Sequence, residues 1–169
     1  DVYLSEEDDQ SPFYGREYSE FEYTNAIYNF FIHPQWDSFG SPTLYLKVLH
    51  ADYAHHFVVI ELIGEWNDAI GNDIMFLKRD VADVFMGHGI TKFILIGENV
   101  LNFHVSDDCY YEEWFEDVQD QGGWVAMINF RDHIIDEMRK ARLSNYLLMG
   151  ERLNDLNWRA VKPFHMHHL

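Results

Sequence analysis

The chain of 169 residues suits a single domain, and its one cysteine, Cys109, excludes an internal disulfide and indicates a reducing, cytoplasmic location. Its net charge of −17 argues against binding to nucleic acid or to an anionic membrane surface, because both carry negative charge themselves. No apolar run reaches the length of a membrane-spanning helix.

Residues 1–24 are predicted to form an acidic N-terminal arm, and residues 25–169 a single α/β domain. The arm holds eight acidic residues against one basic residue, Arg16, and aromatic residues recur through it. We expect the arm to lie on the mildly basic C-terminal helix, on the same chain or on a neighbouring copy, which predicts a homodimer. The alternative is an arm ordered only by packing against unrelated molecules. The interaction candidates are Tyr14, Tyr18 and Phe21 on the arm and Arg139, Lys140 and Arg142 on the helix.

The first predicted elements after the arm are a short strand or helical turn and a loop within residues 25–42. Alternating apolar residues then predict a half-buried strand over 44–49. The nearly continuous apolar run 57–63 predicts a buried strand, and the two strands are expected to form a hairpin. A helix is predicted from Asn72 or Asp73 to about Met86, because apolar residues recur on one face and glycines follow.

The second half of the chain alternates between strands and helices. The run 92–97 predicts a buried strand, which a helix over 106–120 follows. A strand over 124–128 and a helix over 132–147 come next. The tail, 148–169, is expected to be irregular with a short helix around Trp158. The order β-β-α-β-α-β-α predicts a single mixed, mostly parallel sheet of four to five strands with helices packed on it.

Polar side chains follow the second, third and fourth predicted strands. Ligands bind beyond the carboxyl ends of strands in open parallel sheets, so these residues are expected to converge. The catalytic candidates are Glu65, Glu98, Asp132 and His133, because paired carboxylates and imidazoles can exchange protons or hold a cation. The ligand-binding candidates are Trp66, Asn67, Asn99, Asn102, His104, Asn129 and Arg131. The competing interpretation is that these residues only cap helices and fill loops.

Other clusters carry weaker signals. His104 and the terminal histidines His165, His167 and His168 are metal-binding candidates, although a terminal histidine tract is more often a solvated tail. Cys109 follows Asp107 and Asp108, and neighbouring anions make a thiol a poor nucleophile, so we interpret it as inert. The predicted helix over 106–120 carries many acidic residues and could dock a basic partner, with Trp114 and Phe115 as apolar anchors.

The order of elements from Thr43 to Leu147 resembles the STAS domain, the fold of bacterial anti-sigma-factor antagonists and the SpoIIAA-like group. In phosphorylatable members the loop after a central strand carries Asp-Ser-Ser-Gly, whose serine is the switch. Here the strand KFILIG is followed by ENVLNFHVSDD, in which Ser106 occupies a comparable place without the doubled serine and the glycine. The resemblance therefore implies a bacterial regulatory or interaction module.

The sequence favours a non-catalytic regulatory or protein-interaction module, with no cofactor and with a second copy or another protein as partner. The absence of a nucleophile elbow, a phosphate-binding loop and a C-x-x-C pair supports this expectation. The alternative is a metal-assisted hydrolase or small-ligand-binding protein with its site at the carboxyl ends of the strands.

Overall fold

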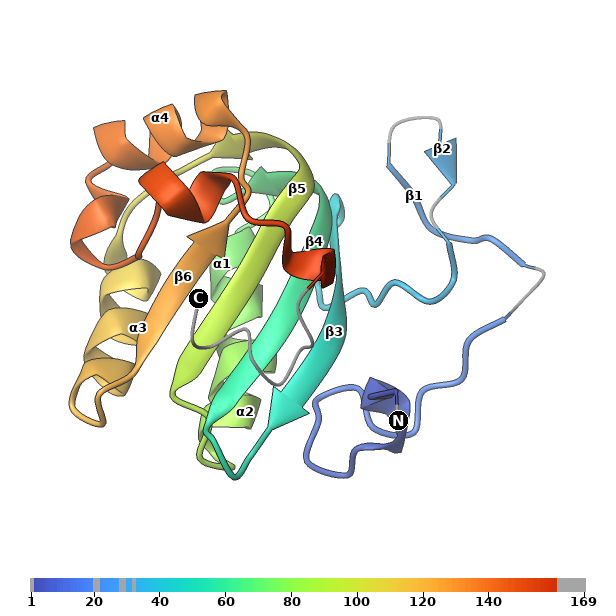
Figure 1. Cartoon of the computed structure of the whole chain (residues 1–169). Coiled ribbons are helices and arrows are strands. Elements are labelled where there is room, and N and C mark those ends of the chain that lie inside the picture. Colours follow the sequence, from blue (N-terminus) through green and yellow to red (C-terminus); the bar gives the residue numbers. More distant parts are fainter. Residues whose placement is uncertain (1, 20–21, 28–29, 32, 161–169) are drawn as a thin grey trace.

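A mixed sheet of four strands forms the centre of the fold. The structure is a computed structural model, and it describes residues 2–19, 22–27, 30–31 and 33–160. Strands β3 (Leu44–Asp52), β4 (Phe57–Asn67), β5 (Lys92–His104) and β6 (Trp124–Ile128) lie side by side in that order (Figure 1). β3 runs antiparallel to β4, whereas β4, β5 and β6 run parallel. The predicted α/β class, hairpin and mostly parallel sheet are confirmed.

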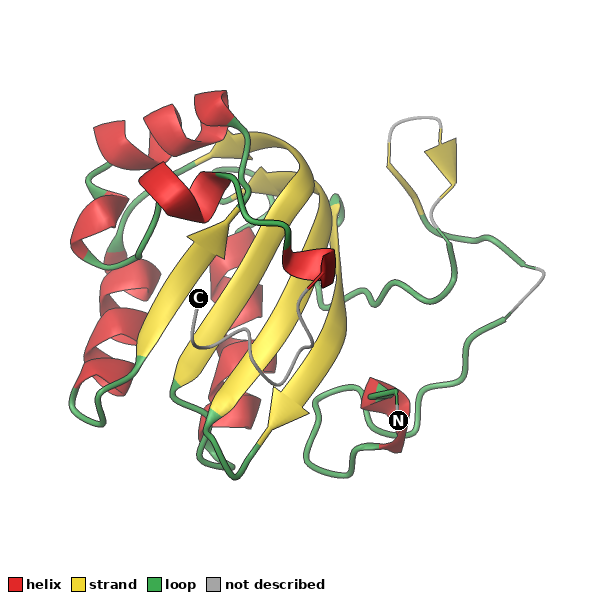
Figure 2. Cartoon of the chain, viewed as in Figure 1, coloured by secondary structure: helices red, strands yellow, loops and turns green. Residues whose placement is uncertain are grey.

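Helices connect the parallel strands. The β4–β5 crossover is one helical stretch made of α1 (Asp73–Phe76), the π-helical segment η2 (Leu77–Ala82) and α2 (Asp83–Met86). α3 (Cys109–Gln119) connects β5 to β6, and α4 (Asp132–Lys140) follows β6. In Figure 2 the helices of the β4–β5 crossover lie behind the yellow sheet. None of the described helices is long and apolar enough to cross a bilayer.

The two faces of the sheet carry different coverings. Alternation along β4 sends Val58, Ile60 and Leu62 into the main core, which also contains the apolar faces of α1, α3 and α4. The opposite face, called the open face below, is covered by Leu156 and Trp158 of the segment that carries the short 3-10 helices η4 (Glu151–Asn154) and η5 (Trp158–Ala160). The buried residues of the open face are Phe57, Val59, Ile94, Ile96 and Ile128.

β4 and β5 extend beyond the apolar runs 57–63 and 92–97 that predicted them, and glycines lie inside both strands. A Cβ on Gly97 would stand 2.3 Å from the Phe130 ring, so glycine allows the ring to pack against the strand. Gly64 has a φ of +119° beside a register shift between β4 and β5. The candidates from Glu65 to Asn67 and from Glu98 to His104 therefore lie within strands, which corrects their predicted place in loops after them.

The last predicted helix is shorter than expected. α4 ends at Lys140, and Arg142 adopts a left-handed conformation with φ of +62° before the 3-10 helix η3 (Leu143–Asn145). The chain then runs along the edge of β6, where the Leu148 amide donates to Val125 and the Met127 amide donates to Leu148. The prediction of a helix continuing to residue 147 was therefore wrong, because this segment protects the sheet edge.

The N-terminal arm packs against β3. After the 3-10 helix η1 (Ser5–Glu7), the Asp8 carboxylate accepts hydrogen bonds from the Tyr3 hydroxyl (2.7 Å) and from the Tyr53 hydroxyl (2.6 Å). Phe13 is buried in the main core. Figure 1 shows the blue arm beside β3 and the orange α4 on the other side of the sheet. The expectation that the arm lies on the basic helix of its own chain was therefore wrong.

The arm continues into the only part of the described chain that forms a second sheet. β1 (Ala26–Ile27) and β2 (Phe30–Phe31) pair antiparallel and stand away from the main sheet in Figure 1. Ile27 packs against Tyr45 of β3. The chain returns to the body at Asp37, whose amide and carbonyl pair with Leu46 at the outer edge of β3.

Candidate functional site

The carboxyl ends of the parallel strands bring several predicted residues near one another. Arg131 Nε donates to the main-chain carbonyl of Glu98 (3.3 Å), and His133 Nε2 lies 2.8 Å from the carbonyl oxygen of Leu101. Glu65 and His104 form a loose pair, with 3.7 Å between Oε1 and Nε2. The predicted residues thus lie near one another but do not form one cluster, and most of their contacts are to main-chain carbonyls.

The Glu98 carboxylate contacts the chain's own C-terminal segment. Its Oε1 accepts hydrogen bonds from Trp158 Nε1 (2.9 Å) and from Arg159 Nη1 (2.8 Å). The Arg159 guanidinium also lies over the Trp158 ring, 4.3 Å from its centre. The catalytic candidate Glu98 therefore holds the C-terminal segment that covers the open face.

The amide candidates also make structural contacts. Asn129, with φ of +56°, exchanges two hydrogen bonds with the backbone of Leu156, and Asn99 Nδ2 donates to Glu61 Oε2 (3.3 Å). Asn67 accepts from the Ile70 amide. Asn102 is half-buried in β5, and Asp132 is exposed in the first turn of α4. Most of these side chains therefore fit the competing interpretation, in which they cap helices and fill loops.

The metal-binding candidates are not grouped. No set of three or more histidine, cysteine or acidic residues within the described ranges is placed to hold a metal ion. His104 has Glu65 as its nearby carboxylate. His165, His167 and His168 lie outside the described residues.

Several interaction candidates face inward. Trp114 is buried in the main core against Phe93, so its predicted role as a surface anchor was wrong. Phe115 is half-buried beside Tyr146. Tyr18 is also half-buried, whereas Tyr14 is exposed on the arm and Phe21 lies outside the described residues. The basic candidates Arg139, Lys140 and Arg142 are exposed at the end of α4.

A buried carboxylate of the polar cluster that follows the second predicted strand, Asp68, lies just beyond β4. Asp68 accepts hydrogen bonds from Trp66 Nε1 (2.9 Å), from the Ile74 amide (2.8 Å) and from the Tyr111 hydroxyl. Burial raises the pKa of Asp68 to about 6, against the opposing effect of these donors. The candidate Trp66 therefore belongs to a buried network that joins β4, α1 and α3. A single aspartate after a strand has no distinguishing pattern.

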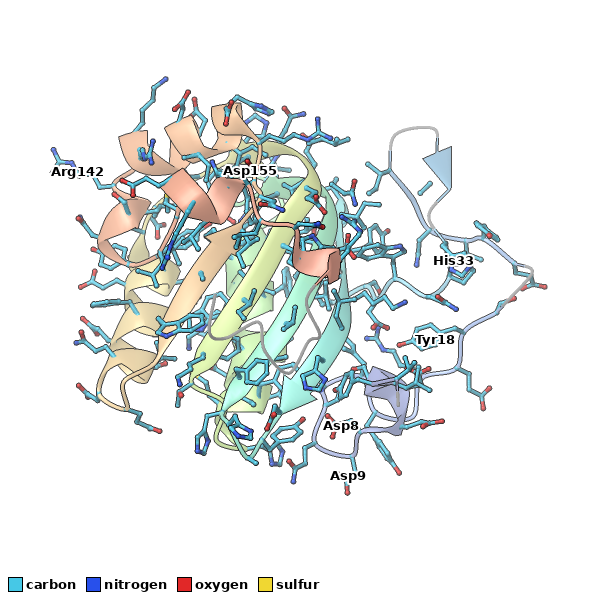
Figure 3. All side chains as sticks on the ribbon, viewed as in Figure 1. Asp8, Asp9, Tyr18, His33, Arg142 and Asp155 are labelled. Carbon is cyan, nitrogen blue, oxygen red and sulfur yellow. The ribbon has the colours of Figure 1, made fainter. Side chains whose placement is uncertain are left out.

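A second buried carboxylate, Asp37, connects the arm to the body of the fold. It accepts from Arg16 Nη1 (3.1 Å) and from the Tyr18 hydroxyl (2.5 Å), and burial raises its pKa. These three residues line a cavity of about 470 Å³ between the arm and β3. In Figure 3 Tyr18 points from the arm toward the sheet. The cavity escaped sequence analysis because the arm and β3 are distant along the chain.

Comparisons with known proteins give a weak structural likeness. No family model matches the chain, and no curated protein matches it. Among solved structures, the phosphorylated form of the Bacillus cell fate determinant SpoIIAA matches with a TM-score of 0.43 and 11% identity, over 63% of this chain and 91% of that chain. The expected weak resemblance to the SpoIIAA-like group is thus found, and it concerns the course of the chain alone. Ser106, in the comparable place, is exposed before α3.

Proposed function

We propose that this chain is a non-catalytic protein-interaction module whose N-terminal arm provides the contact surface. The observation that carries the proposal is the exposure of apolar side chains on the arm. Four of the seven large apolar residues that are exposed in the described ranges lie there, namely Val2, Leu4, Tyr14 and Tyr23. Exposed apolar groups that gather on one segment are typical of interaction sites.

The arm is anchored firmly enough to present these side chains. Phe13 lies in the main core beside the exposed Tyr14, and Asp8 holds Tyr3 beside the exposed Val2 and Leu4. An anchored side chain loses less conformational freedom on binding than one on a free tail. This arrangement supports a binding surface more than a solvating tail.

The partner that we propose is a second copy of the chain. The arm carries a net charge of −7, and Arg139 and Lys140 are exposed at the end of α4, with Arg142 exposed just after it. Because the arm lies on β3 of its own chain, the charge match applies to the α4 end of a neighbouring copy. A cytoplasmic location belongs to the same proposal and is supported by the single, exposed cysteine.

This function is preferred to metal-assisted hydrolysis or ligand binding at the carboxyl ends of the strands. Glu98, which either activity would use, already binds Trp158 and Arg159. A nucleophile or a proton-transfer group needs its polar atoms free to face a substrate.

Light scattering over a concentration series tests the proposal. We expect the unmodified chain to dimerise, and the double variant Leu4→Ser, Tyr14→Ser to raise the dimer dissociation constant at least about tenfold, which is the effect of losing roughly 1.4 kcal/mol of contact energy. Ile70→Ser is the matched control, because Ile70 is exposed away from the arm. Deletion of the arm is unsuitable, since it removes Phe13 from the core. A chain that stays monomeric at every concentration contradicts the homodimer.

A charge reversal tests the contact with α4 separately. Lys140→Glu should weaken the dimer and reduce its sensitivity to salt, because it replaces a favourable charge contact by a repulsive one. Arg152→Glu, an equally exposed change in η4, should leave it unaltered. Equal effects of both variants would show that only net charge matters and would rule out the α4 contact.

A further inference from the structure

The cavity between the arm and β3 is lined by a buried carboxylate that uses only one of its oxygens. Asp37 is 2% exposed, and its Oδ1 accepts both of its side-chain hydrogen bonds, from Arg16 Nη1 and from the Tyr18 hydroxyl. Within the described ranges, no residue donates a hydrogen bond to Oδ2. Buried carboxylate oxygens usually have a donor, and a ligand in the cavity can supply it.

A second carboxylate, Glu6 of η1, lines the same cavity. Burial is the main cause of the raised pKa of Asp37, and the negative charge of Glu6 raises this pKa further. The two carboxylates are therefore close enough to repel each other. An ammonium group between them would relieve the repulsion and could donate a hydrogen bond to each.

Two cations line the cavity beside these acids. Arg16 donates to Asp37 (3.1 Å) and to the Ser38 carbonyl (2.9 Å) through Nη1, and none of the described residues accepts from its Nη2 or Nε. Its guanidinium also lies over the Phe13 ring, 4.6 Å from the ring centre, which holds it in position. Lys47 Nζ makes one long hydrogen bond of 3.4 Å. Arg16 and Lys47 can therefore donate to the carboxylate of a ligand.

The spacing of these charges matches that of an α-amino acid. Asp37 and Arg16 are in contact, so the place for an ammonium group and the place for a carboxylate are adjacent. In an α-amino acid both groups are bonded to one carbon atom. Val2 and Leu4 line the cavity and are exposed, so an apolar side chain could cover them. The volume of about 470 Å³ falls within the roughly 300–1,000 Å³ of typical ligand pockets.

We propose that this cavity binds a free α-amino acid with an apolar side chain, such as leucine. The ammonium group lies between Asp37 and Glu6, the carboxylate contacts Arg16 and Lys47, and the side chain packs against the apolar residues of the arm. A zwitterion has no net charge, so the −17 of the protein does not repel it as it would an anion. This binding goes beyond the proposed function and does not require a dimer.

Calorimetric titration with L-leucine tests the proposal, and the amide NMR signals of Asp37 and Lys47 report where it binds. We expect saturable heat and saturable shifts at both amides. Isocaproic acid lacks the ammonium group of leucine and isoamylamine lacks its carboxylate, so each should bind at least about tenfold more weakly. Absence of saturable binding up to the solubility limit of leucine overturns the proposal, as does equal binding of either analogue.

Variants of the lining residues locate the contacts. Glu6→Gln and Lys47→Met should each weaken leucine binding at least about tenfold. Glu7→Gln is the matched control for the first, because it removes the same charge from an exposed neighbour outside the cavity lining. Lys92→Met is the control for the second, since Lys92 begins β5, two strands away from β3. Leucine binding that survives both lining variants overturns the site, and the two analogues give an independent readout if either variant unfolds.

A residue that only the dimer uses separates the two proposals. Lys140 lies at the end of α4, outside the cavity lining. The Lys140→Glu chain should therefore bind leucine as the wild type does, whether or not it forms dimers. Loss of leucine binding in this variant would place the ligand at the contact between copies and would overturn the site.

Discussion

Asp68 shows how much a single buried side chain can affect this fold. Its pKa of about 6 lies above its usual value of 3.8, so the folded chain binds the proton more tightly than the unfolded chain does. This carboxyl therefore contributes stability that is fully present below about pH 4 and is lost as the pH rises through 6.

Replacement of Asp68 by Asn should flatten this dependence. Asparagine can accept from Trp66 and Ile74 and donate to the Tyr111 oxygen, so the network persists without an ionisable group. When the pH rises from 4 to 7.5, the unfolding free energy of the wild type should fall by up to about 3 kcal/mol, and that of the variant should not show this fall. Urea unfolding at both pH values measures the difference. Parallel pH profiles for the two proteins would show that Asp68 does not titrate there.

At the scale of residues, the sequence located polar groups correctly but could not assign their partners. Glu98 was selected as catalytic because it follows an apolar strand, yet its carboxylate binds Trp158, 60 residues later. Asp37 was not selected, and Asp68 was noticed only as one polar residue after a strand, because burial depends on contacts that are distant along the chain. Local spacing contains no information about such contacts.

Among the elements, the π-helical segment η2 holds a buried charge that joins two helices. Lys78 is 1% exposed, and its ammonium contacts Asp83 of α2 together with Glu113 (3.3 Å) and Asp117 (2.9 Å) of α3. The π turn separates Lys78 from Asp83 by five residues, the spacing at which residues align in such a turn. Three half-exposed carboxylates therefore gather around one cation.

Lys78→Met should leave these carboxylates repelling one another. We expect a loss of about 2–3 kcal/mol, which is below the usual loss for a buried pair because the acids are half-exposed. Adding Asp117→Asn should restore part of the loss, although the same change destabilises the wild type. Urea unfolding of the wild type, the two single variants and the double variant measures the interaction free energy between Lys78 and Asp117. Arg79→Met is the neighbouring control, and a Lys78 variant as stable as this control would contradict the role of Lys78.

Hydrophobic periodicity predicted the identity and order of the elements well, because each strand and helix buries a regular apolar face. It misplaced the ends of those strands and helices whose ends are set by tertiary contacts. The apolar run predicted a strand that ends at Gly97, but β5 continues past it to His104, and the absence of a side chain at Gly97 leaves room for the Phe130 ring. The helix after β6 stops at Lys140, since the following residues pair with the sheet edge.

For the whole molecule, the asymmetry of the sheet is the main feature. One face carries the helices, whereas Leu156 and Trp158 pack against the open face together with Leu49 and Trp124 of the sheet itself. Trp158→Ala should cost about 1–2 kcal/mol, less than a fully buried tryptophan, and should increase binding of a dye that fluoresces on apolar surfaces. Asp155→Ala, an exposed change in the same segment, is the control. Unchanged stability and dye binding in the Trp158 variant would show that the segment does not protect this face.

The covering of the open face has a consequence for synthesis on the ribosome. Phe57, Val59, Ile94 and Ile96 emerge well before Trp158, and translation of the 60 residues between Glu98 and Trp158 takes about 3–12 s at usual rates. During that interval the nascent chain has the open-face residues of β4 and β5 but not the segment that covers them. Newly made copies should therefore bind chaperones and aggregate with one another far more readily than the finished protein.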